Sequence, residues 1–252
     1  MFNLAEHVSV VTGGNGGLGL AYARGLLKAG ASIAIWGRNE EKNAQALAEL
    51  RAMGGDVESF VCDVTDEASI ADSFDQTLSR FSKIDSCFAN AGGGGFRGAS
   101  HAVGRQQWLD TIDLNLMSVV QTWAPITEHM LDRKIPGRLI ATSSIAALLG
   151  TGGAAGYSTT KAAVIGLVQA LAVELGTAGI RVNAILPGFI ETEMSLNTSD
   201  AFQESARRRS PIGRIGELAD MEGIAVYLAS RESDYLTGQG IVMDGGNTIF
   251  PL

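Results

Sequence analysis

Ser144, Tyr157 and Lys161 have the side-chain types and the spacing that proton transfer to or from a substrate oxygen requires. Tyr157 and Lys161 are four residues apart in a run of helix-forming residues, so they share one face of a helix. A phenol normally keeps its proton up to a pKa of about 10, and a neighbouring ammonium lowers that pKa because it stabilises the phenolate. Ser144 lies at the end of a predicted strand, from which its hydroxyl can bond the same oxygen. The spacing also fits an exposed helical pair without chemistry, so the rest of the chain has to separate the two interpretations.

A glycine-rich turn near the N-terminus predicts a binding site for a dinucleotide. The strand-like run 8–11 leads into Thr12-Gly-Gly-Asn-Gly-Gly-Leu-Gly19, after which a helical period begins. Glycines in such a turn allow the sharp bend, the approach of backbone N–H groups to a pyrophosphate, and close packing of helix on sheet. The helix N-terminus then presents unpaired donors to the anion. A purely structural turn is the alternative.

The end of the second predicted strand favours NADP(H) over NAD(H). A carboxylate at this place binds the ribose hydroxyls of NAD, whereas an arginine accepts the 2′-phosphate of NADP. The chain has Arg38 there and no acid, and a guanidinium forms charge-assisted bonds with phosphate. In the alternative, Arg38 only caps the loop and NAD is held by other contacts, with Glu40 and Glu41 close by.

Short β-branched runs alternate with longer helical periods, which is typical of a parallel sheet covered by helices on both faces. Strands are predicted near residues 7–12, 32–36, 57–62, 84–89, 137–142, 180–185 and 240–243, and helices at 17–29, 40–53, 66–80, 105–131, 155–176 and 217–229. The fold predicted for residues 1–252 is a single-domain, Rossmann-type, doubly wound α/β sheet of about seven strands.

Two segments depart from this alternation and are predicted to form the walls of a substrate site. Residues 92–104 contain many glycines, which suggests a mobile loop, and residues 191–211 form a polar insertion with a short helix. Insertions after parallel strands are where such folds place their ligands. Apolar side chains available near this cleft are Phe96, Trp108, Phe189, Met194 and Phe250.

Charge and residue spacing argue against several other classes of function. The formal net charge of −8 and the pI near 4.9 disfavour nucleic acid and an anionic membrane as partners. Cys62 and Cys87 lie in apolar runs and are interpreted as inert, buried thiols. His7, His101 and His129 lack metal-ligand spacing, so no metal site is expected. Without an evident signal peptide or an uninterrupted apolar run near ~18 residues, a cytoplasmic location is expected.

Several motifs together resemble the classical short-chain dehydrogenase/reductase family. They are Thr12-Gly-x-x-x-Gly17-x-Gly19, Asp63, Asn90-Ala91-Gly92, Asn115, Ser144, Tyr157-x-x-x-Lys161, Pro187-Gly188, Thr192 and Asp244-Gly245-Gly246. Their order and spacing carry the resemblance over nearly the whole chain. The family pattern has a second asparagine before Asn90, where this chain has Ala89, and the expected effect is limited to a hydrogen bond of the sheet.

The resemblance implies a role for each matching residue. Tyr157 is the expected acid/base, Lys161 lowers its pKa and binds the nicotinamide ribose, Ser144 polarises the carbonyl, and Asn115 positions a water. Asp63 is expected at the adenine, with helix capping as the alternative, and Asn90 either near the ribose or as a stabiliser of the sheet. The implied cofactor contacts are Gly13, Asn15, Gly17, Leu18, Gly19, Arg38, Asp63, Val64, Asn90, Ala91, Gly92, Tyr157, Lys161, Pro187, Gly188, Ile190 and Thr192.

The function that the resemblance implies is NAD(P)-dependent interconversion of a secondary alcohol and a ketone. The few fixed charges near the predicted cleft suggest a neutral or weakly polar ketone, with a sugar derivative or a 3-oxoacyl compound also open. A homotetramer is implied, paired through the helices at 105–131 and 155–176 and through the carboxyl-terminal strand. The alternative is a dinucleotide-binding sensor or structural protein of the same fold without turnover.

Overall fold

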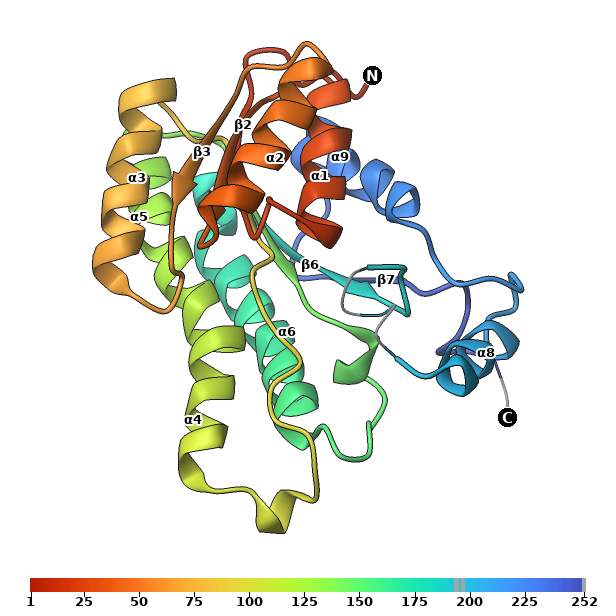
Figure 1. The fold of residues 1–252 in the computed structure, drawn as a ribbon. Helices are drawn as coiled ribbons and strands as arrows, with labels where there is room; N and C mark the ends of the chain where they lie inside the picture. Colours follow the sequence, from red (N-terminus) through yellow and green to blue (C-terminus); the bar gives the residue numbers. More distant parts are fainter. Residues whose placement is uncertain (193–194, 196–197, 251–252) are drawn as a thin grey trace.

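A single sheet of seven parallel strands forms the centre of the protein (Figure 1). The computed structural model describes residues 1–192, 195 and 198–250. The strand order is β3-β2-β1-β4-β5-β6-β7, so the order reverses between β1 and β4, the position at which such sheets bind ligands. The strands are β1 (Val8–Thr12), β2 (Ser32–Gly37), β3 (Val57–Val61), β4 (Ser86–Ala89), β5 (Arg138–Thr142), β6 (Arg181–Pro187) and β7 (Gly240–Met243). Each strand overlaps its predicted range, and the predicted doubly wound parallel sheet is confirmed.

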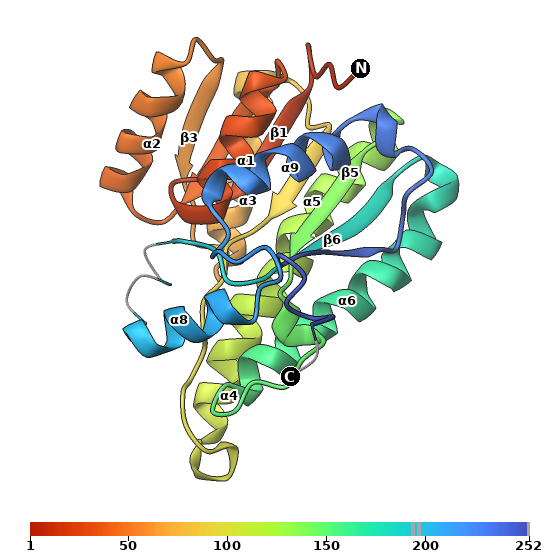
Figure 2. The same ribbon diagram turned by 90° about the vertical axis from the view of Figure 1, so that its right-hand side faces the viewer.

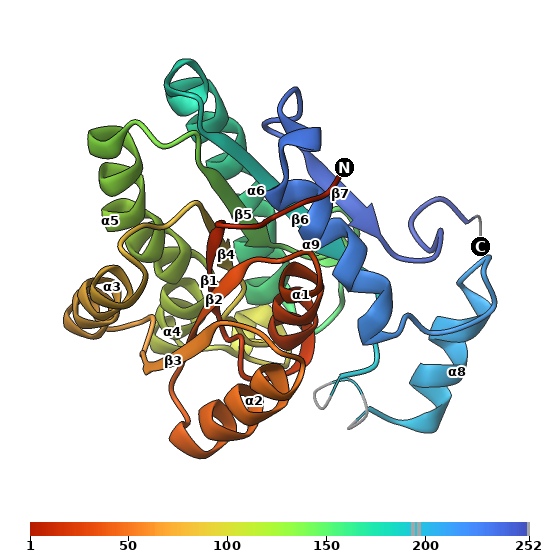
Figure 3. The same cartoon turned by 90° about the horizontal axis from the view of Figure 1, so that it is seen from above.

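Helices cover both faces of the sheet and bury a core on each (Figures 2 and 3). The helices on one face are α1 (Gly17–Lys28), α2 (Glu40–Ala52) and α9 (Glu222–Ala229); those on the other are α3 (Glu67–Phe81), α5 (Ser118–Arg133) and α6 (Ala155–Leu175). Strand β2 shows why both faces are apolar: Ile33 and Ile35 enter the core under α1, whereas Ala34 and Trp36 enter the opposite core. This is the alternation that a strand buried on both faces requires.

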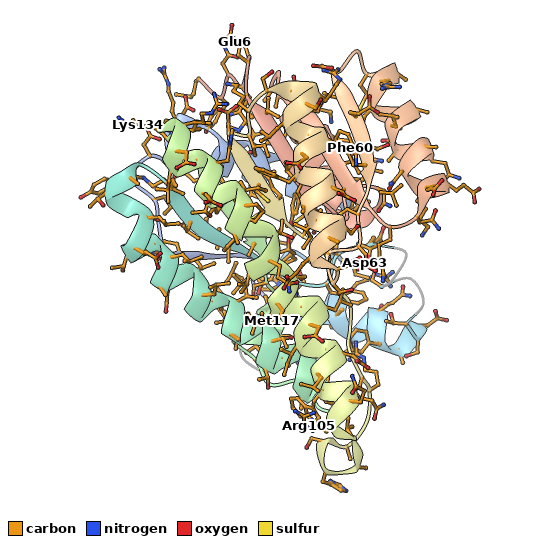
Figure 4. All side chains as sticks on the ribbon, turned by 90° about the vertical axis from the view of Figure 1, so that its left-hand side faces the viewer. Glu6, Phe60, Asp63, Arg105, Met117 and Lys134 are labelled. Atoms are coloured by element: carbon orange, nitrogen blue, oxygen red, sulfur yellow. The ribbon has the colours of Figure 1, made fainter. Side chains whose placement is uncertain are left out.

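The helical region predicted at 105–131 is not one regular helix. It consists of α4 (Arg105–Ile112), a π-helical segment η2 (Asp113–Met117) and α5. The fully buried side chain of Asn115 donates from Nδ2 to the carbonyl of Thr111 (3.2 Å). In a regular α-helix that carbonyl would accept the backbone N–H of residue 115. The widened turn therefore goes together with a polar side chain pointing into the protein, and Figure 4 shows Met117 at this junction and Arg105 at the far end of α4.

The insertion after β6 contains the short helix that the sequence predicts. Helix α8 (Asp200–Arg208) begins at Ser199, whose hydroxyl accepts the N–H of Phe202 (3.3 Å). It lies beside the carboxyl ends of β6 and β7, away from the main helical layers (Figure 2). Residues 193–194 and 196–197 of the insertion, and with them Met194, lie outside the described residues.

Helix α6 is more apolar than we expect from the sequence, in which no uninterrupted apolar run approaches ~18 residues. Together with the 3-10 turn that follows it, the helical stretch Ala155–Ala178 is long and apolar enough, by length and composition alone, to cross a membrane, and 28% of its most apolar window is buried. A core helix of a soluble protein meets the same criterion, and α6 packs its Val164 and Val168 into the core beneath the sheet. The outward row of α6 includes Ala162, Gly166 and Val173, which are exposed.

Candidate active site

The glycine-rich turn forms an open cradle at the carboxyl edge of the sheet. Gly13 (φ +62°) and Gly17 (φ +49°) adopt backbone angles that favour glycine. A Cβ atom at Gly19 would collide with the carbonyl oxygen of Gly13 and lie 2.6 Å from Nδ2 of Asn90, so the packing of α1 on the turn and on Asn90 also requires glycine. A Cβ atom at Gly16 would meet no atom of the described residues within 4 Å. The packed turn with open space before the N-terminus of α1 fits a bound pyrophosphate.

Asn15 ties this turn to the end of β2. Its Nδ2 donates to Oδ1 of the buried Asn43 (2.7 Å), and Nδ2 of Asn43 donates to the carbonyl of Gly37 (2.8 Å). Leu18 packs against the core on the α1 face. The side chains of Asn15 and Leu18 are therefore used in packing and hydrogen bonds within the protein. Any contact of these two residues with a cofactor would come from their backbone.

Arg38 and Asp63 approach each other at the ends of β2 and β3. The distance from Nη1 of Arg38 to Oδ2 of Asp63 is 3.6 Å, and the side chains are 65% and 39% exposed. Burial pushes the pKa of Asp63 upward, but hydrogen bonds from Thr65 and the charge of Arg38 outweigh it, and the pKa lies below its ordinary value. An exposed cation thus stands beside a carboxylate at this edge, where Figure 4 labels Asp63.

The helices that begin near these two residues are capped by other side chains. Asn39 caps α2 and Asp66 caps α3, each by accepting a backbone N–H of the first turn (2.8 and 3.0 Å). Asp63 is not the cap of α3, but its Oδ1 accepts the N–H (2.9 Å) and the hydroxyl (2.7 Å) of Thr65 in the turn that leads into this helix. Val64, next to Asp63, is buried in the core.

Asn90 joins the ends of three strands. Its N–H and that of Ala91 both donate to the hydroxyl of Thr12 (3.0 Å each), and its Nδ2 donates to the carbonyl of Thr12 (3.1 Å). Its Oδ1 accepts from the hydroxyl of Thr142 (3.1 Å). Of the two roles expected for Asn90, stabilising the central sheet is the one that these contacts describe.

Asn115, Gly92 and Lys161 come together below the end of β4. The N–H of Gly93 donates to Oδ1 of Asn115 (3.0 Å). A Cβ atom at Gly92 would lie 2.9 Å from that Oδ1 and 3.4 Å from Nζ of Lys161. Only glycine therefore lets the chain pass between the amide and the ammonium.

Lys161 is held inside the protein by one strong contact. Its Nζ donates to the carbonyl of Thr142, the last residue of β5 (2.8 Å), and the residue is 4% exposed. Burial lowers the pKa of Lys161 to about 8. The ammonium thus loses charge far more readily than a surface lysine does.

The pKa of Tyr157 moves in the direction opposite to the one that the sequence predicts. Burial raises it, while a hydrogen bond with the hydroxyl of Ser144 and the positive charge of Arg97 act to lower it. Nζ of Lys161 lies 5.8 Å from the centroid of the Tyr157 ring, and Lys161 is not among the groups that lower this pKa. The shared helix face is observed, but burial of the phenol outweighs the effect of the charges.

The two neighbouring serines at the end of β5 have different partners. Ser143 is 2% exposed, and its hydroxyl donates to the carbonyl of Lys161 (2.8 Å), which attaches α6 to the sheet. The hydroxyl of Ser144 accepts the N–H of Ala146 (3.1 Å) and lies near enough to the phenol of Tyr157 to act on its pKa. The structure therefore brings Ser144, and not Ser143, to the phenol.

The segment after β6 returns toward the glycine-rich turn. Pro187 ends β6, and a Cβ atom at Gly188 would lie 2.6 Å from Cβ of Asp244. Ile190 then pairs with Gly216 in a short parallel bridge. A Cβ atom at Gly17 would lie 3.7 Å from the methyl group of Thr192, so this segment and the turn face each other across the cradle.

Three residues at the site have contacts that the sequence reasoning missed. Thr12 and Thr142 end β1 and β5 and bond both Asn90 and, through the Thr142 carbonyl, Lys161. The sequence feature that could have identified Thr12 and Thr142 is a threonine as the last residue of a strand, at the carboxyl edge of the sheet. Arg97 acts electrostatically on Tyr157, and only its position in the loop after β4 indicates this.

Two cavities lie beside these residues. One of about 360 Å³ is between the ends of β6 and β7 and the insertion, and one of about 250 Å³ is under Gly95 and Phe96. Within the described part of the chain, no group of three His, Cys, Asp or Glu residues could hold a metal ion.

The chain is similar to known proteins over nearly its whole length. A family model described as enoyl-(acyl carrier protein) reductase matches residues 13–248. The chain is 34% identical to 3-oxoacyl-[acyl-carrier-protein] reductase FabG of Chlamydia pneumoniae (95% of this chain, 96% of that protein) and 32% identical to gluconate 5-dehydrogenase of Gluconobacter oxydans (99% and 97%). The solved structure of a 7α-hydroxysteroid dehydrogenase with NADH and 7-oxo glycochenodeoxycholic acid superposes with a TM-score of 0.93 at 27% identity (97% and 95%).

The chain therefore belongs to the short-chain dehydrogenase/reductase family. It is an oxidoreductase that uses a nicotinamide dinucleotide to interconvert a secondary alcohol and a ketone.

Proposed function

We propose that Asn115, Ser144, Tyr157 and Lys161 form the catalytic site, with Tyr157 as the group that exchanges the proton. The observation that carries the proposal is the grouping of these side chains at the end of β5, with Lys161 bonded to Thr142 and 5.8 Å from the ring of Tyr157, and with Ser144 acting on the phenol, at the same edge of the sheet as the glycine cradle. A carbonyl oxygen placed between the hydroxyls of Ser144 and Tyr157 would accept hydrogen bonds from both, which polarises it for attack at carbon.

The raised pKa of Tyr157 suits reduction. A phenol that keeps its proton at neutral pH is the form that can donate to the alkoxide that develops on the substrate. Lys161 lies on the same face of α6 as Tyr157. Because its pKa is about 8, it can release and regain a proton near neutral pH. Asn115 is proposed to hold a water that reloads Lys161 and, through it, Tyr157.

The cofactor is proposed to lie across the cradle, with its nicotinamide beside Tyr157. When bound, the nicotinamide gives a hydride, with its two electrons, to the carbonyl carbon of the ketone, or takes one from the alcohol. The chain supplies the position and the proton on oxygen. The contacts proposed are Gly13, Asn15, Gly17, Leu18 and Gly19 at the pyrophosphate, Arg38, Asp63 and Val64 at the adenosine, Asn90, Ala91, Gly92, Tyr157 and Lys161 at the nicotinamide ribose, and Pro187, Gly188, Ile190 and Thr192 at the carboxamide.

NADP(H) is proposed as the preferred cofactor because of Arg38. Its guanidinium is 65% exposed and meets only the carboxylate of Asp63, at 3.6 Å, within the described part of the chain. A 2′-phosphate would replace this long contact with charge-assisted bonds. The Arg38→Asp variant should lose about 10- to 100-fold in NADPH affinity and little in NADH affinity, as measured by nucleotide fluorescence titration. Equal losses for both nucleotides would contradict the preference.

The experiment that tests the proposed function is a coupled screen with NADPH and NADH. Matched ketones, keto sugars and 3-oxoacyl thioesters are offered to wild type and to Tyr157→Phe, and nucleotide oxidation is followed. Turnover by wild type that the variant loses supports the proposal. Tight nucleotide binding without turnover of any carbonyl would instead identify a dinucleotide-binding sensor.

We also propose the domain organisation, the assembly and the location of the protein. Residues 1–252 act as one dinucleotide-binding and catalytic domain, and the described parts of 191–211 form one wall of the substrate site. The apolar, exposed row on α6 supports pairing of copies into a homotetramer, with the edge strand β7 at a second interface. The protein is proposed to be cytoplasmic, which is consistent with its two buried, free cysteines.

A further inference from the structure

The loop between β4 and α4 is anchored to α4 and to the start of α6. Phe96 is 8% exposed, and its ring meets that of Trp108 edge-on at 4.9 Å. A Cβ atom at Gly156 would lie 2.5 Å from the Phe96 ring, so the loop packs directly on the first turn of α6. The N–H of Gly98 donates to the carbonyl of Gly153 (3.0 Å). The loop expected to be mobile is therefore fastened on both sides of Arg97.

Arg97 stands between these two anchors with its guanidinium turned back toward the start of the loop. A Cβ atom at Gly94 would lie 3.4 Å from Nη2 of Arg97. The same loop begins at Gly92, which packs against Asn115 and Lys161. The guanidinium thus lies over the segment that leads from Gly92 into the loop, and its charge acts to lower the pKa of Tyr157.

Arg97 has an exposed side chain, and no carboxylate of the described residues forms an ion pair with it. The chain has more acidic than basic residues, with a formal net charge of −8. An arginine without an acidic partner is therefore not explained by an excess of basic residues. A guanidinium presents a planar fork of donors that matches a carboxylate in a bidentate pair. An arginine so placed can orient a substrate that carries a negative charge near its carbonyl.

We propose that Arg97 binds the carboxylate of the substrate, so that the enzyme acts on an oxo acid and its hydroxy acid. The inference rests on the proposed function and narrows its substrate class. It replaces the expectation of a neutral ketone, which took no account of this side chain. Arg97 is a specificity-determining residue that touches the substrate away from the reacting carbon.

The test compares substrates that differ only in the charged group. Acetoacetate is paired with methyl acetoacetate, and 5-keto-D-gluconate with L-sorbose. For wild type, kcat/KM should be higher for the acid of at least one pair. Arg97→Gln should lower kcat/KM for that acid by about 10- to 100-fold and leave the neutral partner within about 2-fold. Arg97→Lys should restore part of the loss.

Arg105→Gln serves as the matched control, because Arg105 is an exposed arginine at the start of α4. It should leave both members of each pair unchanged. If Arg97 acted only through its charge on Tyr157, Arg97→Gln would slow the acid and the neutral substrate by the same factor. That result, or faster turnover of the neutral member of both pairs by wild type, would overturn the inference.

A binding measurement separates failure of this inference from failure of the proposed function. The Tyr157→Phe variant loaded with NADPH is titrated calorimetrically with acetoacetate, 5-keto-D-gluconate and malonate, with and without Arg97→Gln. Binding of at least one acid that weakens about 10-fold with Arg97→Gln supports the carboxylate site even if wild type reduces none of the ketones. No binding of any acid, or equal binding to both proteins, would overturn it.

Discussion

Burial decides the charge states of the two titratable side chains at the site. It raises the pKa of Tyr157 and lowers that of Lys161 to about 8, so each group is pushed toward its neutral form. The phenol therefore holds a proton that it can donate, and the lysine is poised to lose or regain one close to neutral pH. The surroundings that do this are the end of β5 and the buried face of α6.

The buried ammonium of Lys161 predicts a pH-dependent cost to stability. Below pH 8 the lysine is protonated in both the folded and the unfolded chain, and the folded protein carries the full cost of burial. Between about 8 and 10.5 the unfolded chain binds the extra proton, so the stability of wild type rises with pH. Relative to Lys161→Met, wild type should therefore gain roughly 2–3 kcal/mol between pH 7 and pH 10 in urea unfolding.

Lys28→Met provides the control for this measurement, because Lys28 is an exposed lysine on α1. It should show much less change between the two pH values. A constant difference between wild type and Lys161→Met across this range would contradict the burial of the charge.

At the residue scale, side-chain types and spacing were enough to bring Ser144, Tyr157 and Lys161 to one place. They did not predict the direction of the Tyr157 pKa shift, because spacing shows which groups are close but not how much water surrounds them. The role of Arg97 was missed for a related reason. Its position depends on Phe96 packing against α6, a contact between segments about 60 residues apart in the chain.

At the element scale, the unit formed by β1, the glycine turn and α1 has the tightest steric demands. A Cβ atom at Gly19 would lie 2.6 Å from Nδ2 of Asn90, whereas one at Gly16 would meet no described atom within 4 Å. Asn90 in turn holds Thr12 and Thr142, so a displacement at Gly19 would spread to three strand ends. The turn is therefore a structural joint as well as a ligand cradle.

This contrast predicts different outcomes for two alanine substitutions in one turn. Gly19→Ala should destabilise the protein by about 1–3 kcal/mol, since overpacking shifts α1 or Asn90. Gly16→Ala, at an extended backbone position, should leave stability within about 0.5 kcal/mol and reduce nucleotide affinity by filling the cradle. Thermal unfolding without nucleotide and fluorescence titration with NADPH distinguish them. Equal stability of the two variants would contradict the packing described for α1.

The elements themselves were largely predictable, because apolar runs in parallel strands and helical periods in the covering helices are strong local signals. The break at η2 was not, because the apolar period of α4 continues through Asp113–Met117 into α5. The helix widens where the buried side chain of Asn115 bonds the carbonyl of Thr111. This side chain is held there by the site, and local helix propensity does not predict it.

At the scale of the whole molecule, the outward side of α6 exposes apolar surface that nothing in the single chain covers in the described structure. Val173 is 85% exposed and continues a row with Ala162 and Gly166, whose small size permits close approach of another helix. Apolar surface on so long a helix is typical of an interface between subunits. This row supports the proposed homotetramer, and it lies on the helix that carries Tyr157 and Lys161.

Val173→Glu should therefore dissociate the assembly. Placing a carboxylate at the middle of a paired apolar face costs several kcal/mol per interface, because the charge is buried without a partner. Light scattering coupled to size exclusion should show a tetramer for wild type and a smaller species for the variant, with a folded circular-dichroism spectrum in both. A monomeric wild type would refute the assembly without affecting the catalytic proposal.

The central claim is that Tyr157 supplies the proton while the rest of the site binds and positions the reactants. Tyr157→Phe removes only the phenolic hydroxyl, and Phe fits the same half-buried space. Its affinity for NADPH, measured by fluorescence titration, should stay within about 3-fold of wild type, because the glycine cradle is intact. Its kcat/KM with the best ketone of the screen should fall by about 10²- to 10⁴-fold. A variant that binds NADPH normally and retains near wild-type turnover would contradict the assignment of Tyr157.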